Sequence, residues 1–312
     1  MYYFIFLIDK IVKETLGYLS TFDRGFLYGD GIFETLRTYN KKPFQLEDHI
    51  ARLSNSAKYF DIPFSYTYKQ IQKIINQLLD KNNLKDAYIR MTLSRGYGGN
   101  GLIPTGVCNP TFVIHAKPLA VYPASLYTTG VSLITSPIRR STTCPLLRHK
   151  TLNFLANYLI KKEAIDKGVH DTLILNTDNH VAECTVSNIF IVEKNTVITP
   201  SLNTNILPGI TRKVILELCK ENGIHASEEL FGLNRVIGAD EVFITNSLME
   251  VMPVSRIDGQ HIGRYIPGDI TRLLHDKYKT LTHSCLHKSC THVNREMLSA
   301  MLDITGINEY ID

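Results

Sequence analysis

Apolar residues fall on one helical face in three stretches of the chain. Their spacing of three and four positions predicts helices over 68–83, 152–168 and 210–223. Short apolar or alternating runs elsewhere are typical of β-strands. They predict strands over 1–12, 42–49, 86–96, 110–119, 171–177, 180–194, 196–201 and 240–247.

The predicted strands outnumber the helices, and several strands follow one another with no helix between them. This order favours an α+β fold or a barrel-like sheet with flanking helices over a doubly wound sheet, in which strands and helices alternate. The pattern weakens over 118–130, where Pro, Ser and Gly accumulate. We therefore expect a small N-terminal domain over 1–120, a linker at 121–130 and a second domain over 131–280.

The composition indicates a globular protein, because 44% of the 312 residues are hydrophobic and can bury a large core. The 34 Lys and Arg barely outnumber the 30 Asp and Glu, and they form no cluster that would bind nucleic acid or an anionic membrane. Asp9 and Lys10 interrupt the apolar start well short of the ~20 residues that span a bilayer. Six scattered cysteines, with no recognisable signal peptide, favour reduced thiols and a cytoplasmic location.

The segment 281–312 is rich in potential zinc ligands. These are two cysteines and three histidines: Cys285, Cys290, His283, His287 and His292. Their spacing fits none of the common zinc signatures. We therefore expect no metal site and treat 281–312 as a tail of unknown role.

One lysine stands in an unusual place in LLRHKTLNFLANYLIKKEA. Lys150 stands in front of an apolar, helix-like run, where desolvation would penalise its charge, whereas Lys161 and Lys162 lie at the polar far end of that run. Lys150 is either an ordinary basic residue near a helix start or a neutral, reactive amine that holds a ligand covalently. Lys161 and Lys162 are expected on the surface.

The glycine-rich stretch SRGYGGNG formally contains the dinucleotide-binding pattern G-x-G-x-x-G at Gly96, Gly98 and Gly101. That fingerprint requires a helix directly after it, but the segment that follows, LIPTGVCNP, contains two prolines and a glycine and is not expected to form a helix. A flexible loop beside a substrate pocket is the better interpretation. Arg95 and Arg90 could bind a carboxylate there, or they are simply surface arginines near a turn.

Two further positions could hold parts of a ligand. In LPGITR a helix begins near Gly209, so the amides of Ile210 and Thr211 could bind a phosphate or form an ordinary helix start. In VAECTVSNIF, Glu183 interrupts an apolar strand, so it either faces solvent or lies buried beside a cation or a protonated ring nitrogen. Together with Lys150, these positions indicate a ligand that has an aldehyde-like electrophile, a phosphate and a basic ring nitrogen.

Pyridoxal 5'-phosphate has those three groups, and nearly the whole chain to about residue 280 resembles the class IV aminotransferases, also called fold-type IV pyridoxal-phosphate enzymes. Six motifs carry the resemblance by their order and spacing: FDRGFLYGDGIFETLR, LEDHIARL, HKTLNFLANYL, VAECTVSNIF, LPGITR and EVFITNSLMEVMPV. The resemblance implies a small N-terminal α/β sandwich-like domain and a larger C-terminal pseudo-barrel domain. It also implies a homodimer or higher oligomer, with the loop at 95–104 near the neighbour's cofactor.

The resemblance also implies roles for individual residues. Lys150 matches the lysine that forms a Schiff base with the cofactor and later moves the substrate proton, and Glu183 matches the glutamate that keeps the pyridine nitrogen protonated. The implied phosphate contacts are Arg52, Ile210, Thr211 and Ser247, of which Ser247 could instead bind the substrate carboxylate. The implied substrate contacts are Phe33, Thr35, Tyr88, Arg90, Arg95 and Leu248.

The family divides among branched-chain aminotransferases, D-amino-acid aminotransferases and 4-amino-4-deoxychorismate lyases. Phe33 stands where the D-amino-acid enzymes usually carry Tyr, and Tyr97 replaces the His of their Arg-x-His pair. VAECTVSNIF lacks the Gly-x-Gly-Glu-Asn pattern of standard branched-chain enzymes, although Tyr88 and Arg90 are similar to that group's carboxylate-binding strand.

Two features resemble the lyases. Thr35 stands where they have a threonine thought to assist proton transfer, and NSLMEVMPV is close to their pattern. Asn100 and Leu102, however, replace the Arg and Tyr usual in many lyases. Because transamination is the commoner activity in the family, the leading interpretation is transfer of an amino group between an amino acid, such as a branched-chain one, and a 2-oxo acid. The lyase, which releases pyruvate and 4-aminobenzoate, is the alternative; a non-catalytic pyridoxal-phosphate binder is a remote one, since Lys150, Glu183 and Arg52 are all intact.

Overall fold

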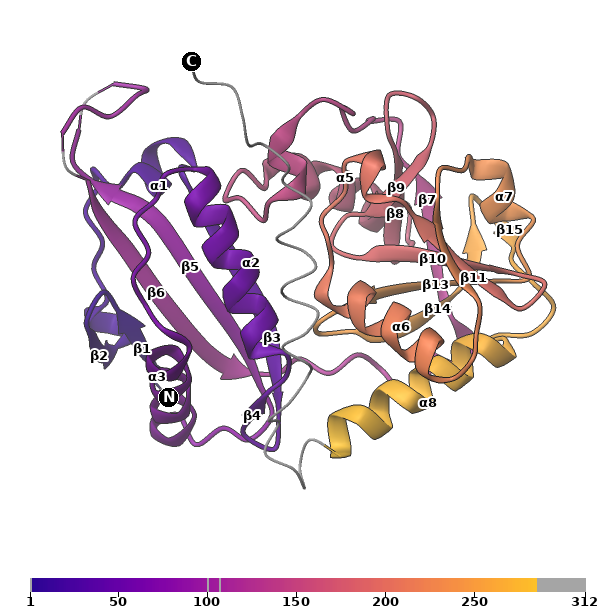
Figure 1. Ribbon diagram of the computed structural model, residues 1–312, viewed down its shortest axis with the longest axis horizontal. Helices are drawn as coiled ribbons and strands as arrows, with labels where there is room; N and C mark the ends of the chain where they lie inside the picture. Colours follow the sequence, from indigo (N-terminus) through magenta and orange to yellow (C-terminus); the bar gives the residue numbers. More distant parts are fainter. Residues whose placement is uncertain (1, 100, 107, 285–312) are drawn as a thin grey trace, which may run out of the picture.

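Two β-sheets, each covered by helices, form the two lobes of the computed structural model (Figure 1). The structure describes residues 2–99, 101–106 and 108–284. The last strand of the first sheet ends at Pro118 and the first strand of the second begins at Val131, so the intervening segment joins the lobes. The predicted α+β, two-domain architecture is confirmed.

The first lobe is a small antiparallel sheet with helices on one face. Its elements are β1 (Phe4–Leu7), β2 (Lys10–Lys13), η1 (Glu14–Leu16), α1 (Arg24–Tyr28), β3 (Gly31–Tyr39), β4 (Lys42–Pro43), α2 (Leu46–Tyr59), α3 (Tyr68–Lys81), β5 (Ala87–Tyr97) and β6 (Asn109–Pro118). The strand order is β2-β1-β6-β5-β3-β4, and every pairing is antiparallel. α2 and α3 bury their apolar faces against the sheet, with Leu53, Ile71 and Ile75 packing near Leu36 and Ile89.

The second lobe is a larger, curled mixed sheet. Its elements, with the short helix α4 that precedes the sheet, are α4 (Leu126–Thr129), β7 (Val131–Thr135), η2 (Pro145–Arg148), α5 (Leu155–Asp166), β8 (Asp171–Leu175), β9 (Val181–Cys184), β10 (Asn188–Glu193), β11 (Thr196–Pro200), η3 (Leu202–Thr204), α6 (Ile210–Glu221), β12 (Ala226–Glu229), α7 (Leu233–Ile237), β13 (Glu241–Asn246), β14 (Glu250–Ile257), β15 (Gln260–His261) and α8 (Asp269–Ser284). The strand order is β12-β11-β10-β13-β14-β7-β8-β9, with β15 beside β14. One apolar core lies within this sheet, and α6 and α8 enclose a second one on its outer face.

Three predicted strands differ from the structure. The segment 1–12 is a hairpin of β1 and β2 rather than one strand. The second half of 42–49 belongs to α2, because Leu46, Ile50 and Leu53 recur at helical spacing and are buried together. The segment 180–194 is also broken into two strands: the backbone reverses at 185–187, where the Cys184 amide donates to the Ser187 carbonyl at 2.8 Å.

The helices of the described residues include none with the length and apolar character needed to cross a bilayer. The cysteines in this part of the chain, Cys108, Cys144, Cys184 and Cys219, are all free thiols. Of the candidate zinc ligands, His283 lies in α8 with Nδ1 2.7 Å from the Lys279 carbonyl oxygen. Cys285, Cys290, His287 and His292 lie outside the described residues.

Candidate active site

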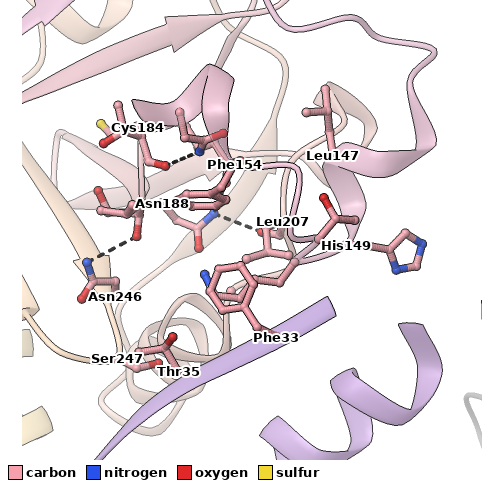
Figure 2. A pocket seen from close by; sticks show the side chains of 18 of the residues that line it. Phe33, Thr35, Leu147, His149, Phe154, Cys184, Asn188, Leu207, Asn246 and Ser247 are labelled. Atoms are coloured by element: carbon pink, nitrogen blue, oxygen red, sulfur yellow. Dashed lines mark hydrogen bonds between the residues drawn. The ribbon is translucent and has the colours of Figure 1, made fainter. Parts of the chain in front are cut away.

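A cavity of about 400 Å³ lies between the two lobes. In Figure 2, Phe33 and Thr35 stand on β3 below Leu207 and Asn188 of the second lobe. The cavity is within the size range of small-molecule sites. Its wall contains every predicted site residue except Arg95, namely Phe33, Thr35, Arg52, Tyr88, Arg90, Lys150, Glu183, Ile210, Thr211, Ser247 and Leu248.

Lys150 lies in an extended segment between η2 and α5, and β3 fixes the backbone of that segment. The Phe33 amide donates to the Lys150 carbonyl at 2.8 Å, and the Leu152 amide donates to the Gly31 carbonyl at 2.9 Å. The side-chain nitrogen, Nζ, is 4.6 Å from the centre of the Phe33 ring. Burial, reinforced by the positive charge of Arg52, lowers the pKa of Lys150 to about 8. An appreciable fraction of this amine is therefore neutral near pH 8.

Glu183 is buried at the end of β9, so it does not face solvent as in the simpler interpretation of the sequence. Arg140 donates to its Oε1 at 2.5 Å, and Asn188 donates to its Oε2 at 3.3 Å. Burial raises the pKa of Glu183, and the positive charge of Arg140 offsets part of that increase. The carboxylate and its partner cation both lie on the cavity wall.

Arg52 on α2 is held by a buried acidic partner. Its Nε and Nη2 donate to the two oxygens of Glu34 at 2.7 and 2.8 Å, and Nη1 donates to the Pro208 carbonyl at 2.8 Å. Burial alone would raise the pKa of Glu34, but Arg52 and His49 together hold it at about 2. These bonds to described residues use three of the five N–H groups of a guanidinium, so within this part of the chain one on each terminal nitrogen remains for an anion.

The start of α6 lies on the same wall. Among the described residues, no side chain caps this helix, so the amides of Ile210 and Thr211 are not used by a capping side chain. A Cβ at Gly209 would come within 1.8 Å of Asn188 Oδ1, so a larger residue here would displace the Asn188 side chain, which donates to Glu183. Arg52 and this helix start line one cavity and together suit a phosphate.

A second positive group lies on β5. The guanidinium carbon of Arg90 is 3.7 Å from the centre of the Phe33 ring, and Nε donates to Thr92 Oγ1 at 3.2 Å. Tyr88, two residues earlier on the strand, also lines the cavity. This wall can bind a carboxylate next to an aromatic surface.

Arg95 is not part of this cavity, contrary to its predicted place among the substrate contacts. Its guanidinium is committed elsewhere: Nε donates to Asp30 Oδ2 at 2.8 Å, and the terminal nitrogens donate to the carbonyls of Asp61 and Phe60 at 2.9 and 2.7 Å. The reason is the alternation of β5, which directs side chains to opposite faces in turn. Arg95 therefore secures loops of its own lobe.

The sequence interpretation missed several cavity residues and their supports. Glu34 was detectable, because it shares one face of β3 with the apolar Ile32 and Leu36, all of them buried. His49 was detectable with it, being one helical turn from Arg52 on α2. Nothing in the sequence separates Arg140, which pairs with Glu183, from its neighbour Arg139.

An unpaired hydroxyl also lies in this wall. Thr245 Oγ1 is buried and has no hydrogen-bond partner among the described residues. Together with the remaining N–H groups of Arg52 and the uncapped start of α6, this hydroxyl can form hydrogen bonds with a polar ligand. The residues present therefore fit pyridoxal phosphate: an amine for the aldehyde, an acidic side chain for the ring nitrogen and a phosphate site.

Comparison with known proteins supports the same family. The model of the family described as amino-transferase class IV matches residues 31–257. A Methanocaldococcus jannaschii protein, provisionally assigned as a branched-chain-amino-acid aminotransferase, is 40% identical over 278 residues, covering 89% of this chain and 96% of its own length. The D-alanine aminotransferase of Bacillus licheniformis is 36% identical (80% and 87% covered), and the aminodeoxychorismate lyase of Bacillus subtilis is 32% identical (91% and 96% covered).

A solved structure agrees with these sequence matches. The branched-chain amino acid aminotransferase of Escherichia coli superposes with a TM-score of 0.86 at 28% identity, covering 90% of this chain and 95% of the other. The family model spans most of the chain, and the relatives match nearly its whole length. The chain therefore belongs to the class IV aminotransferase family.

Proposed function

We propose that this protein is a pyridoxal-phosphate-dependent aminotransferase that moves an amino group between an amino acid and a 2-oxo acid. One observation carries the proposal: the low-pKa amine of Lys150, the buried carboxyl group of Glu183 and the anion site at Arg52 and α6 line a single cavity. When bound, the cofactor would supply an electron-withdrawing ring that stabilises negative charge on the substrate α-carbon.

The residues would divide the work by their chemistry. Lys150 holds the aldehyde end and moves a proton to and from the substrate, for which a pKa near the working pH is favourable. Glu183 keeps the ring nitrogen protonated, while Arg52, Ile210, Thr211 and Ser247 hold the phosphate. The substrate would lie against Phe33, Thr35, Tyr88, Arg90 and Leu248.

The alternative is a 4-amino-4-deoxychorismate lyase, which releases pyruvate and 4-aminobenzoate. Thr35 lines the cavity as this alternative requires, and the lyase of Bacillus subtilis matches most of the chain. Both reactions begin when a base removes the proton from the same kind of carbon, so Lys150 serves either one.

Absorption spectroscopy distinguishes the two reactions. We would titrate the purified protein, loaded with pyridoxal phosphate, with L-glutamate, L-leucine, D-alanine and aminodeoxychorismate in separate cuvettes. We expect at least one amino acid to convert the bound cofactor to pyridoxamine phosphate, and a 2-oxo acid to reverse the change. If every amino acid leaves the spectrum unchanged while aminodeoxychorismate yields pyruvate, the protein is a lyase.

We also propose a homodimer. Large apolar side chains are exposed on and before α1, including Phe22 at 74% and Phe26 at 77%. The surface continues into the second lobe, where Leu155 is 72% exposed and the nearby Asn153 donates to the Gly29 carbonyl at 3.1 Å. An exposed apolar surface of this kind marks an association site.

A charge in this surface should separate the subunits. We expect the unaltered protein to be dimeric by light scattering and Phe26→Lys to be largely monomeric at micromolar concentration, because a buried unpaired charge opposes association. Tyr265→Lys, at a residue 77% exposed in the second lobe after β15, is the matched control and should stay dimeric. Equal masses for the two variants would contradict the proposed interface.

A further inference from the structure

The turn between β13 and β14 carries Ser247 and Leu248 on the cavity wall. Asn246, at the end of β13, fixes this turn from within. Its Oδ1 accepts hydrogen bonds from the amides of Leu248 at 2.9 Å and Met249 at 2.8 Å. Figure 2 shows Asn246 directly above Ser247 at this edge of the cavity.

Two carbonyls of the same turn accept hydrogen bonds from residues outside β13 and β14. Tyr127 of α4 donates its hydroxyl to the Met249 carbonyl at 2.9 Å. Arg37 of β3 donates Nη1 to the Leu248 carbonyl at 3.4 Å, which is a long hydrogen bond. The turn is therefore tied to β3, the strand of the first lobe that also carries Phe33 and Thr35.

Glu250, the residue that ends the turn, has a conformation that its type rarely adopts. Its φ of 65° lies in the left-handed region, where glycine or asparagine is usual at this point of a hairpin. Its side chain is nevertheless buried. A strained backbone at a buried acidic residue is maintained only when the surroundings fix that residue.

The surroundings of Glu250 do fix it. Oε1 accepts hydrogen bonds from the Tyr39 hydroxyl at 2.7 Å and from Arg37 Nη1 at 3.0 Å, and His275 Nε2 of α8 lies 3.4 Å from Oε2. Burial alone would raise the pKa of Glu250, but His275, Tyr39 and Arg37 lower it. The carboxylate therefore keeps its charge and holds Arg37, whose Nη1 also reaches the Leu248 carbonyl.

We propose that Glu250 is a positioning residue that sets the turn of Ser247 and Leu248 against β3, and so sets the position of Leu248 relative to Phe33 and Thr35, where the substrate would lie. Glu250 itself does not line that cavity. It acts through Arg37, which joins the two lobes at this point. The inference rests on the proposed function in one respect, that Leu248 and Phe33 contact substrate.

The test compares two acidic residues with left-handed backbones at opposite ends of β14: Glu250 is the first residue of the strand and Asp258 directly follows its last residue. Glu250→Gly removes the carboxylate and places glycine, which favours a positive φ, at this position. Asp258→Gly makes the same change at a φ of 51°. The Asp258 carboxylate accepts hydrogen bonds from Thr135, at the end of β14 far from the turn. We expect Glu250→Gly to raise KM for the amino acid by about 10-fold, because weakening a contact made equally in the ground state and the transition state raises KM alone, and one such contact contributes about that factor. We expect kcat to change by less than about threefold, since Lys150 and Glu183 lie on other elements.

Hydrogen exchange gives a readout that is independent of turnover. The amides of Leu248 and Met249 should exchange faster in Glu250→Gly and remain unchanged in Asp258→Gly. Glu250→Gln keeps an acceptor for Tyr39 but loses the charge. Its KM and its amide exchange rates should lie between those of Glu250→Gly and the unaltered protein. This variant replaces Glu250→Gly in the test if the glycine variant fails to fold.

Equal KM values and equal amide exchange for the Glu250 and Asp258 variants would overturn the inference. Failure of the proposed function looks different. In that case the unaltered protein would take up no pyridoxal phosphate at Lys150, while exchange at Leu248 and Met249 would still report whether Glu250 positions the turn.

Discussion

Replacing Lys150 with methionine should reduce turnover by about 10⁴-fold, the upper end of what acid–base catalysis supplies, and should make the cofactor-free protein more stable. The two effects have one origin. The amine is useful because burial beside Arg52 lowers its pKa to about 8, and the same burial penalises its charged form in the folded protein. Methionine has a similar shape and no charge.

The sign of the stability change follows from the two pKa values of Lys150. The pKa is about 8 in the folded protein and 10.5 without the perturbation. As pH rises from 8 to 10.5 the folded state loses its proton first, so stability increases through this window. Below pH 8 the charged lysine costs about 3 kcal/mol, which methionine removes. Urea unfolding should show that gain at pH 7 and little difference above pH 10.5.

Lys162→Met is the control for both measurements. Lys162 is an exposed lysine on α5, paired with Asp166, and its loss should leave turnover intact and alter stability little. Borohydride should fix pyridoxal phosphate on Lys150 in this control and in the unaltered protein, and should leave Lys150→Met unlabelled. A labelled lysine elsewhere, or a stability difference that does not depend on pH, would contradict the role of Lys150.

The sequence contains much of the fold because the relevant signals are local. The helix over 68–83 is confirmed by α3, where Ile71, Ile75, Leu78 and Leu79 are buried together. The failures occur where two local signals compete. In 42–49 a short β-like start precedes the helical spacing of α2, and 180–194 contains a reversal at 185–187 that apolar residues on both sides conceal.

The site was predictable only where a residue conflicts with its neighbours. Lys150 before an apolar run and Glu183 within one were recognisable for this reason, and Glu34 should have been. Arg95 and Arg140 gave no such signal. Each is an arginine in a mixed segment, and its role depends on Asp30 or Glu183, which the fold brings close from positions distant in the sequence.

Glu183→Gln should retain the cofactor through Lys150 and Arg52 but reduce kcat by about 10²- to 10³-fold, the usual loss for a preorganised electrostatic contact. Glutamine has nearly the same shape and still accepts from Arg140, but it cannot stabilise a protonated ring nitrogen. The variant also leaves Arg140 buried beside a neutral group, which we expect to destabilise the protein by about 3 kcal/mol.

A second substitution separates the lost chemistry from the lost stability. Arg140→Gln combined with Glu183→Gln removes the unpaired cation, so thermal unfolding should return toward that of the unaltered protein. Turnover should not return, because no anion faces the ring nitrogen in either variant. Recovery of turnover together with stability would mean that Glu183 acts only by neutralising Arg140. Recovery of stability alone would assign the buried carboxylate to the chemistry of the cavity.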